Sequence, residues 1–222
     1  MERSPEPRHT LYLSRANADG IKINLIKPNG GVVPFYSVSH NAKMTKMEVR
    51  RIKCDAISAE HRPVGHIKTH TIPPRVDVAV RGVDFKMTRK HPLSNALSFR
   101  FLGVGEMRWE QLGKKSRGMR LIDFNGKTLA HFRPRLHVMS AGRGGGEKDG
   151  SNPLAGGLKG LNRAGWGPGF ELHAALADLD LDLVVTTGLA AAEHRRQLDE
   201  DWDMVAEEDT WEAQQLDKAR GS

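Results

Sequence analysis

The sequence has little cysteine, few aromatic residues and no long apolar run. Cys54 is the one cysteine among 222 residues, which excludes an internal disulfide framework and any multi-cysteine zinc or redox motif. Hydrophobic residues make up 38% and aromatics 6%, enough for one modest core with polar segments attached. No run of about 18 apolar residues occurs, and the first residues lack the apolar stretch of a signal peptide. We therefore expect an intracellular protein without a transmembrane segment, cytoplasmic or peripheral to a membrane, with the nucleus as an alternative.

Charge is distributed unevenly along the chain. Residues 1–137 contain 26 Lys and Arg against 11 Asp and Glu, a net charge of +15, whereas residues 138–222 contain 8 against 16, a net charge of −8. This pattern is typical of a basic body with an acidic tail. The tail either only solvates the chain or folds back over a basic surface and screens it from an anionic partner. Its Trp202 and Trp211 are candidates for contact with a protein partner.

The clearest secondary-structure signal lies in residues 76–87, where apolar and polar residues alternate. If Arg81-Gly82 forms a two-residue turn, the apolar residues face one another across a β-hairpin. The expected pairs are Val80 with Val83, Val78 with Phe85 and Val76 with Met87. On the other face Asp77 lies across from Lys86, so opposite charges meet directly. The pattern therefore predicts a hairpin with one buried face.

A second hairpin is marked by Asn125-Gly126, the dipeptide typical of a type I′ turn. Pairing outward from this turn gives a core face and a mixed, partly basic face. The expected core pairs are Leu121 with Ala130 and Met119 with Phe132. The expected pairs on the other face are Ile122 with Leu129, Phe124 with Lys127 and Arg120 with His131.

Further short strands, separated by turn residues, are predicted along the chain. They cover residues 11–14, 20–27, 33–39, 47–53, 65–70, 97–102, 105–111 and 170–176. Residues 139–169 contain 11 glycines and interrupt this pattern, which predicts a flexible loop. The loop lacks the Gly-Lys-Ser/Thr of a phosphate-binding loop, so we expect no nucleotide site there. Strands at this spacing indicate an antiparallel sandwich or barrel.

The segment 178–196 predicts a buried helix. Aspartates near its start and His194-Arg195-Arg196 near its end suit the helix dipole. From Leu183 onward the segment is apolar on nearly every side, which is typical of a helix buried all round. About sixteen helical residues span about 24 Å, close to the length of a strand of six to eight residues, about 20–26 Å. We therefore predict a mainly β fold, an antiparallel closed β-barrel of about 10–12 strands that encloses this C-terminal hydrophobic helix.

The predicted organisation is a flexible N-terminus (1–10), a barrel domain (11–197) and an acidic tail (198–222). Residues 121–132, which read LIDFNGKTLAHF, and the apolar helix from Asp178 to Ala192 resemble the strand–turn–strand unit and central helix of the tubby C-terminal-like superfamily. That superfamily includes tubby, LURP-one-related and scramblase-like proteins, and the sequence also resembles a fungal branch of it. The resemblance implies binding of anionic phospholipid headgroups (phosphoinositides) at membrane surfaces, an adaptor role, and neither a catalytic centre nor a cofactor.

Basic residues must supply such binding, because Lys and Arg form charge-assisted hydrogen bonds with phosphate. The candidate residues are Lys114, Lys115 and Arg117 in a cationic loop, with Arg120 and Lys127 on the non-core face of the second hairpin. Simple solvation is the alternative for a loop of this kind.

Other kinds of chemistry find less support in the sequence. His61, His66 and His70 have ligand-like spacing, but Pro63 and Gly65 oppose the helix that such a zinc site needs, so we expect no metal. No nucleophile motif is present, so we do not expect an enzyme. A nucleic-acid-associated protein is a weaker alternative, because aromatic residues for base stacking are scarce on the polar faces. A protein-interaction barrel without a lipid ligand is the other alternative, and we expect a monomer.

Overall fold

The computed structural model describes residues 9–199, apart from 18–19, 28–30, 56–57, 71–74, 92–93, 95, 114–115 and 138–165. Several segments singled out in the sequence therefore lie outside the described residues. They are the N-terminus through residue 8, Lys114 and Lys115, most of the glycine-rich segment, and the tail from residue 200 with Trp202 and Trp211.

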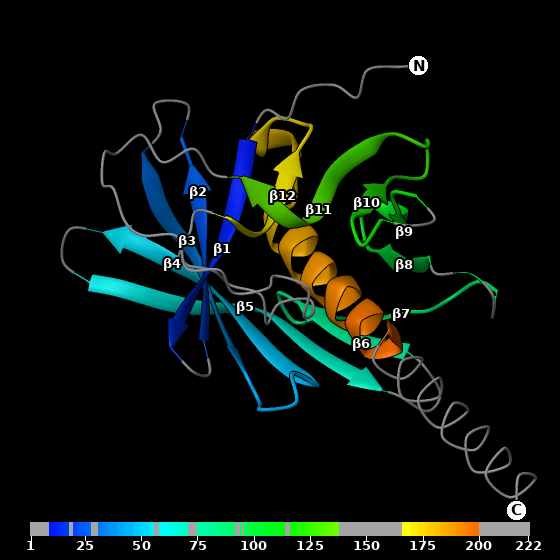
Figure 1. Ribbon diagram of the computed structural model, residues 1–222, viewed down its shortest axis with the longest axis horizontal. Coiled ribbons are helices and arrows are strands. Elements are labelled where there is room, and N and C mark those ends of the chain that lie inside the picture. Colours follow the sequence, from blue (N-terminus) through cyan, green and yellow to red (C-terminus); the bar gives the residue numbers. More distant parts are fainter. Residues whose placement is uncertain are drawn as a thin grey trace, which may run out of the picture.

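Twelve antiparallel strands form one sheet that curls into a nearly closed barrel (Figure 1). The strands are β1 (His9–Asn17), β2 (Gly20–Ile26), β3 (Val32–His40), β4 (Lys46–Asp55), β5 (Ser58–His70), β6 (Arg75–Val80), β7 (Val83–Met87), β8 (Leu97–Phe101), β9 (Gly105–Gln111), β10 (Met119–Ile122), β11 (Thr128–His137) and β12 (Trp166–Leu172). Their order in the sheet is β7-β6-β5-β4-β3-β2-β1-β12-β11-β10-β9-β8. The mainly β barrel predicted from the sequence is confirmed.

The two edge strands, β7 and β8, approach each other where the barrel closes. Thr88, directly after β7, and Ser98 of β8 exchange two backbone hydrogen bonds, with N–O distances of 3.0 and 2.8 Å. This bridge joins a single pair of residues, whereas the other neighbouring strands pair over several residues. The barrel is therefore nearly closed rather than hydrogen-bonded evenly all the way round.

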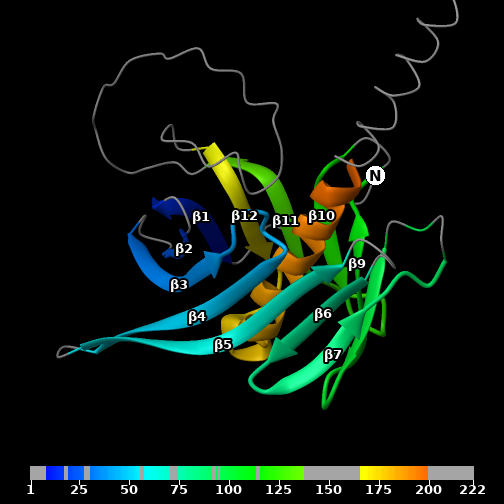
Figure 2. The ribbon, with the colours of Figure 1, turned by 90° about the horizontal axis from the view of Figure 1, so that it is seen from below.

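The central helix, residues 181–199, lies inside this barrel and follows a short 3₁₀ helix, η2 (Leu176–Asp178). Figure 2 shows the helix between strands β10–β12 on one side and β4–β6 on the other. Residues 181–194 are all buried, as expected for a helix with apolar residues on all sides. It begins three residues later than the sequence predicts because Asp180 acts as its N-cap: Asp180 Oδ1 accepts a hydrogen bond from the Leu183 backbone N–H at 3.2 Å.

Two glycines allow the helix and the barrel wall to approach closely. A Cβ atom at Gly188 of the helix would lie 2.3 Å from Phe170 Cε1 and 3.0 Å from Trp109 Cζ2. A Cβ atom at Gly65 of β5 would lie 2.3 Å from Thr186 Oγ1. The missing side chain at Gly188 therefore allows close contact between the helix and aromatic side chains of the wall.

The N-terminal end of the helix is tied to the barrel by polar contacts. Tyr36 of β3 donates a hydrogen bond from its hydroxyl to Asp182 Oδ1 at 2.7 Å. Arg81, in the turn after β6, contacts Asp180 with both terminal nitrogens and lies 3.7 Å from Asp182 Oδ2. Burial, followed by the Asp182 charge, raises the pKa of Tyr36, so its hydroxyl stays a donor. These contacts fix where the helix enters the barrel.

The β6–β7 hairpin has the predicted register. Val80 pairs with Val83, Val78 with Phe85, Val76 with Met87 and Asp77 with Lys86. Arg81 and Gly82 have φ values of 50° and 80°, the left-handed conformation that a type I′ turn requires at both central positions. The two-residue turn predicted from the sequence is therefore confirmed.

The β10–β11 hairpin follows the prediction only away from its turn. Met119 pairs with Phe132, Arg120 with His131 and Leu121 with Ala130, but Ile122 pairs with Thr128 after a register shift. Gly126 has a φ of 82° and Asn125 is not among the residues with positive φ, so the predicted type I′ turn is wrong. Asp123 explains the difference, because its Oδ1 accepts hydrogen bonds from the Asn125 and Lys127 N–H groups at 2.9 and 2.8 Å.

The last strand, β12, lies four residues earlier than the predicted strand 170–176 and includes residues 166–169 of the glycine-rich segment. Close approach to β1 explains why glycine is needed there. A Cβ atom at Gly169 would lie 2.6 Å from the Leu11 carbonyl oxygen, and one at Gly167 would lie 2.8 Å from Tyr12 Cε2. The sequence predicts a loop from these glycines, but Gly167 and Gly169 instead allow β12 to approach β1 closely.

Candidate functional site

A groove of about 760 Å³ opens on the outer face of strands β4–β7. Most residues that line it have side chains on the outer face of the sheet. They alternate along the strands with other lining residues, such as Met47, Ile67 and Val78, whose side chains are buried in the barrel. Its lining residues are Ser39, His40, Asn41, Lys46, Met47, Glu48, His66, Ile67, Lys68, Asp77, Val78, Ala79, Asp84, Phe85 and Lys86. We call this surface the lysine groove after Lys46, Lys68 and Lys86.

The three lysines of the groove lie in one row across neighbouring strands. Lys46 of β4 pairs directly with Lys68 of β5, Lys68 pairs with Asp77 of β6, and Asp77 pairs with Lys86 of β7. All three lysines are exposed, and within the described part of the chain none of their ammonium groups has an ion-pair partner. Two like charges therefore lie directly opposite each other, an arrangement that destabilises a sheet unless something compensates it.

The groove also contains three acidic residues, two of which contact basic side chains of their own. Glu48 Oε1 lies 2.5 Å from Arg50 Nε. Asp77 Oδ2 lies 2.7 Å from His70 Nε2, and its Oδ1 lies 3.5 Å from Arg75 Nε. Asp84 is exposed on β7. Among the described residues, the three lysines are therefore offset in part by Asp84 and by Asp77, which lies between Lys68 and Lys86 in the row.

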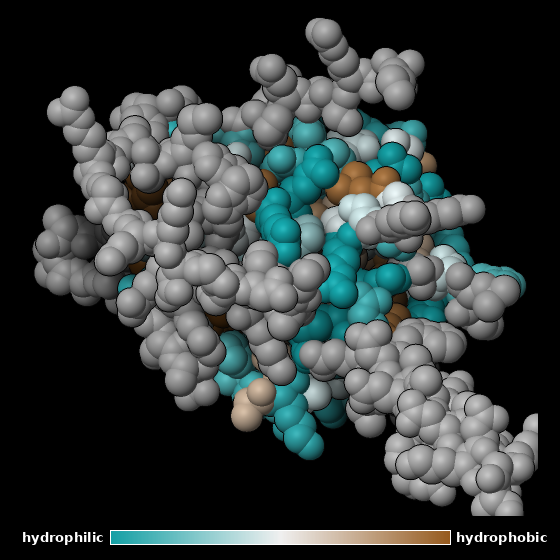
Figure 3. Space-filling view, viewed as in Figure 1, coloured by the Kyte–Doolittle hydropathy of each residue, from teal (hydrophilic) through white to brown (hydrophobic). Residues whose placement is uncertain are grey.

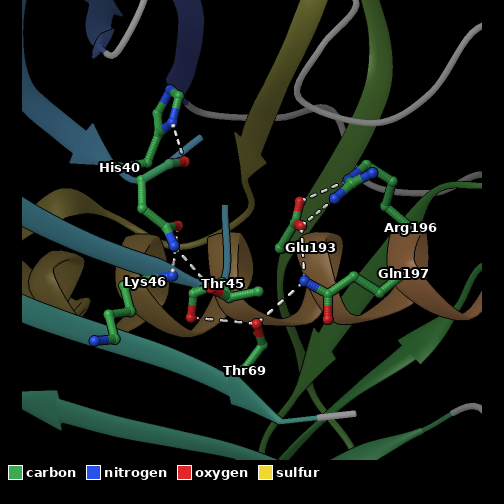
Figure 4. Close-up of polar contacts among 8 residues, drawn as sticks. His40, Thr45, Lys46, Thr69, Glu193, Arg196 and Gln197 are labelled. Carbon is green, nitrogen blue, oxygen red and sulfur yellow. Dashed lines mark hydrogen bonds and ion pairs between the residues drawn. The ribbon is translucent and has the colours of Figure 1, made fainter. Parts of the chain in front are cut away.

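A series of hydrogen bonds joins one end of the groove to the central helix (Figure 4). Asn41 Oδ1 accepts from the Lys46 backbone N–H at 3.0 Å, and Asn41 Nδ2 donates to Thr45 Oγ1 at 2.9 Å. Thr69 Oγ1 donates to the Thr45 carbonyl at 3.3 Å and accepts from Gln197 Nε2 at 3.1 Å. Figure 4 also shows the Lys46 ammonium pointing away from the helix. The backbone that carries Lys46 is thus held in place while its charge faces outward.

The buried charges at this end of the helix have partners within the barrel. Glu193 is completely buried, and its carboxylate accepts hydrogen bonds from Arg196 at 2.9 and 2.5 Å and from Gln197 at 2.9 Å. His194 Nε2 lies 3.5 Å from a terminal nitrogen of Arg89. Burial, followed by the Arg89 charge, lowers the pKa of His194 to about 4. The Glu193 carboxylate is satisfied internally, so we assign its contacts to fold stability.

The structure places Arg117 and Lys127, two of the predicted cations, at opposite ends of β10. Lys114 and Lys115 lie outside the described residues, and Arg117 is exposed beside them in the loop before β10. Lys127 is exposed in the turn at the opposite end of β10. Because β10 has four residues, these two ends are separated by about 13 Å or more. A single ligand headgroup would have to span that distance to contact both.

Arg120 is already engaged by a carboxylate on the neighbouring strand. Glu110 Oε1 lies 2.7 Å from Arg120 Nε and 2.5 Å from one of its terminal nitrogens. The other oxygen, Oε2, lies 3.0 Å from Arg108 Nε. A ligand phosphate would therefore have to compete with Glu110 for Arg120.

The lysine row is not among the sites identified from the sequence, although the positions of Lys68 and Lys86 can be predicted from it. Strand alternation places Lys68 on the same face as His66 and His70, and the β6–β7 register places Lys86 opposite Asp77. What the sequence does not give is the β4–β5 register that sets Lys46 opposite Lys68, because strand β5 contains a bulge at Val64. Cross-strand pairing of like charges is thus visible only in the fold.

The histidines considered as metal ligands in the sequence are separated in the structure. His70 binds Asp77, whereas His66 is exposed in the groove, and the side chain of His61 lies outside the described residues. A different group of side chains, His131, Glu171 and His173, places its ligand atoms within 4.8 Å of one another.

The described surface is mostly hydrophilic on the face shown in Figure 3. Exposed large apolar side chains occur singly at strand ends and turns, where Leu102 is 83% and Phe124 is 69% exposed. Within the described residues, no helix is both long and apolar enough to cross a membrane. Polar contacts are therefore the main source of binding specificity that this surface offers.

Comparison with family models, curated proteins and solved structures finds no match to this chain. Function must therefore be inferred from the residues themselves.

Proposed function

We propose that this protein is a non-enzymatic binding protein for phosphate-bearing anions of the phosphoinositide class, and that the headgroup binds in the lysine groove. The observation that carries the proposal is the direct pairing of Lys46 with Lys68, with Lys86 in the same row. An anion between these lysines would remove their mutual repulsion. Phosphate oxygens accept charge-assisted hydrogen bonds from several ammonium groups at once, so a phosphate ester suits this row.

The other groups in the groove favour a phosphorylated polyol over a simple phosphate ion. A volume of about 760 Å³ lies within the range of small-molecule sites. The carboxylates of Glu48 and Asp84 can accept hydrogen bonds from ligand hydroxyls, while Ser39 supplies a hydroxyl of its own. Lysines for phosphates and carboxylates for hydroxyls together match an inositol phosphate.

The setting at a membrane surface is supported by the sequence resemblance to the tubby C-terminal-like superfamily, which also favours an adaptor role. A headgroup presented by a bilayer can reach the groove because the lysines lie on the outer face of the barrel and are exposed. Binding of this kind weakens as salt screens exposed charges.

The test is liposome flotation of the full chain at near-physiological salt. Neutral, phosphatidylserine-containing and phosphoinositide-containing vesicles are compared, with and without a soluble inositol phosphate as competitor. A groove triple variant (K46Q/K68Q/K86Q) is matched with a loop triple variant (K114Q/K115Q/R117Q), which removes the same amount of charge. We expect the wild type and the loop variant to float with phosphoinositide vesicles, and the groove variant to stay at the bottom.

Other outcomes would contradict the proposal in distinguishable ways. Equal loss of flotation in both triple variants would indicate general electrostatic attraction, and loss in the loop variant alone would move the site to residues 114–117. Direct binding of soluble inositol phosphate, measured by calorimetry, without any vesicle binding would leave a free phosphate ester as ligand. Failure to bind any vesicle or inositol phosphate would favour a protein-interaction barrel, and salt-steep binding to nucleic acid would favour that alternative instead.

A further inference from the structure

Three side chains with metal-binding atoms converge on the outer face of β11 and β12, away from the lysine groove. His131 of β11 lies directly opposite Glu171 of β12. His173 follows two residues after Glu171, and alternate residues of an extended chain share a face. The backbone N–H of His173 donates to the Leu129 carbonyl at 2.9 Å, which holds this residue against β11 just beyond the end of β12. The fold therefore places the three side chains together.

The distances between the ligand atoms are close to those of a tetrahedral metal site. His131 Nδ1 lies 3.0 Å from His173 Nε2 and 3.5 Å from Glu171 Oε2. Ligand bonds of about 2.0–2.1 Å in a tetrahedron place neighbouring ligand atoms about 3.3 Å apart. The two observed distances lie on either side of that value, so an ion could enter with small side-chain shifts.

The protonation of the cluster also suits a cation. The two histidine nitrogens face each other at 3.0 Å, so at most one of them carries a proton. Glu171 adds a carboxylate oxygen beside them, 3.5 Å from His131 Nδ1. The cluster thus offers a ring-nitrogen lone pair and a carboxylate oxygen to a cation.

Arg133 opposes metal binding and supplies a way to test it. Its Nε lies 2.8 Å from Glu171 Oε2, the same oxygen that faces His131. A metal ion would have to share this carboxylate with the guanidinium or displace it. Because two like charges would then lie close together, removal of the Arg133 charge should strengthen metal binding.

We propose that His131, Glu171 and His173 bind a divalent transition-metal ion of the zinc class. Two imidazoles and one carboxylate suit Zn²⁺, Co²⁺ or Ni²⁺ rather than Mg²⁺ or Ca²⁺, which prefer oxygen ligands. Three protein ligands leave a fourth position for water. Bound metal would cross-link β11 to the segment that leads from β12 toward the central helix, and would stabilise the folded state by mass action.

The experiment uses the full chain after treatment with EDTA and dialysis. ZnCl₂ is titrated by calorimetry with MgCl₂ as a control, the melting temperature is followed in parallel, and CoCl₂ is added to record the intense visible absorption of tetrahedral Co²⁺. The variants are H173A, E171Q and R133Q, and H91A is the matched control because His91 is exposed between β7 and β8, outside the lysine groove. H173A avoids changing His131, which is 5% exposed and contributes to packing.

We expect one Zn²⁺ per chain, an increase in melting temperature, and tetrahedral Co²⁺ absorption. Loss of a ligand in H173A or E171Q should weaken Zn²⁺ binding at least about tenfold, since even outer partners of metal ligands contribute about that much. R133Q should bind Zn²⁺ more tightly than the wild type, and H91A should bind it equally. Absence of stoichiometric Zn²⁺ binding, or equal affinity in H173A, E171Q and the wild type, would overturn the proposal.

Discussion

Trp109 of β9 donates a hydrogen bond from its indole Nε1 to Thr187 Oγ1 of the central helix at a distance of 3.0 Å. Both residues are buried almost completely inside the barrel. The Thr187 hydroxyl in turn donates to the Leu183 carbonyl at 2.7 Å, so it is satisfied both as acceptor and as donor. This bond fixes the rotation of the helix relative to the wall, because only one face of the helix presents Thr187 to Trp109.

Thr187→Val should lower the free energy of unfolding by about 1–3 kcal/mol. The substitution preserves shape but leaves the buried Trp109 N–H without an acceptor, and a buried unsatisfied donor costs about that much. Urea unfolding followed by tryptophan fluorescence measures the change. The neighbouring residue supplies the control, because Thr186 Oγ1 is buried without a hydrogen-bond partner in the described structure.

Thr186→Val should therefore be neutral or raise the free energy of unfolding by up to about 1 kcal/mol, since it replaces an unsatisfied hydroxyl with a methyl group. The two substitutions are chemically identical and adjacent in the helix. Equal destabilisation by both would show that the Trp109–Thr187 bond has no special importance.

Gly188→Ala should lower the free energy of unfolding by about 1–2 kcal/mol. Overfilling a core costs about 1–3 kcal/mol, and the gain in helix propensity, about 1 kcal/mol, offsets part of this. The added methyl would meet the Phe170 ring at 2.3 Å. Gly113→Ala is the control, because nothing lies within 4 Å of its Cβ position. A Gly188→Ala protein as stable as wild type would contradict close contact between helix and wall.

His194 should make the fold sensitive to mild acid. Burial and the Arg89 charge lower its pKa in the folded protein to about 4, from an ordinary value of 6.5. Between these values the unfolded chain binds a proton that the folded chain does not, so stability falls as pH decreases from about 6.5 to about 4. The loss reaches up to about 3 kcal/mol.

Urea unfolding of the wild type and of His194→Gln at pH 7, 5.5 and 4 checks this expectation. The variant should lose less stability than the wild type over that interval, although it starts from a lower value because its side chain is buried. Parallel pH dependence in the two proteins would rule out His194 as the source of the acid sensitivity.

The sequence predicts local features of this fold better than distant ones. The alternation in residues 76–87 and the Arg81-Gly82 turn determine a register that depends only on neighbouring residues, and it is confirmed in full. The central helix is predictable because no polar face interrupts residues 183–192. Its start at residue 181 depends on which aspartate serves as N-cap, and Asp178, Asp180 and Asp182 compete for that role.

The features that sequence reasoning missed depend on a competing local side chain in one case and on distant residues in the others. Asn125-Gly126 does not form a type I′ turn because the Asp123 side chain provides competing hydrogen bonds. Gly169 belongs to a strand because the Leu11 carbonyl approaches it, which its own neighbourhood does not reveal. The lysine row likewise requires the β4–β5 register, and a bulge in β5 makes that register unreadable from alternation alone.

The most direct test of the account is calorimetric titration of a soluble inositol trisphosphate into the full chain at near-physiological salt. The wild type is compared with K46Q/K68Q and with K114Q/K115Q, two variants of equal charge. One-to-one binding is expected in the wild type and in K114Q/K115Q. A loss of at least about tenfold is expected in K46Q/K68Q, since each charged hydrogen bond contributes about 1.5–3 kcal/mol. Absence of binding to the wild type, or equal weakening in the two variants, would contradict a phosphate site in the lysine groove.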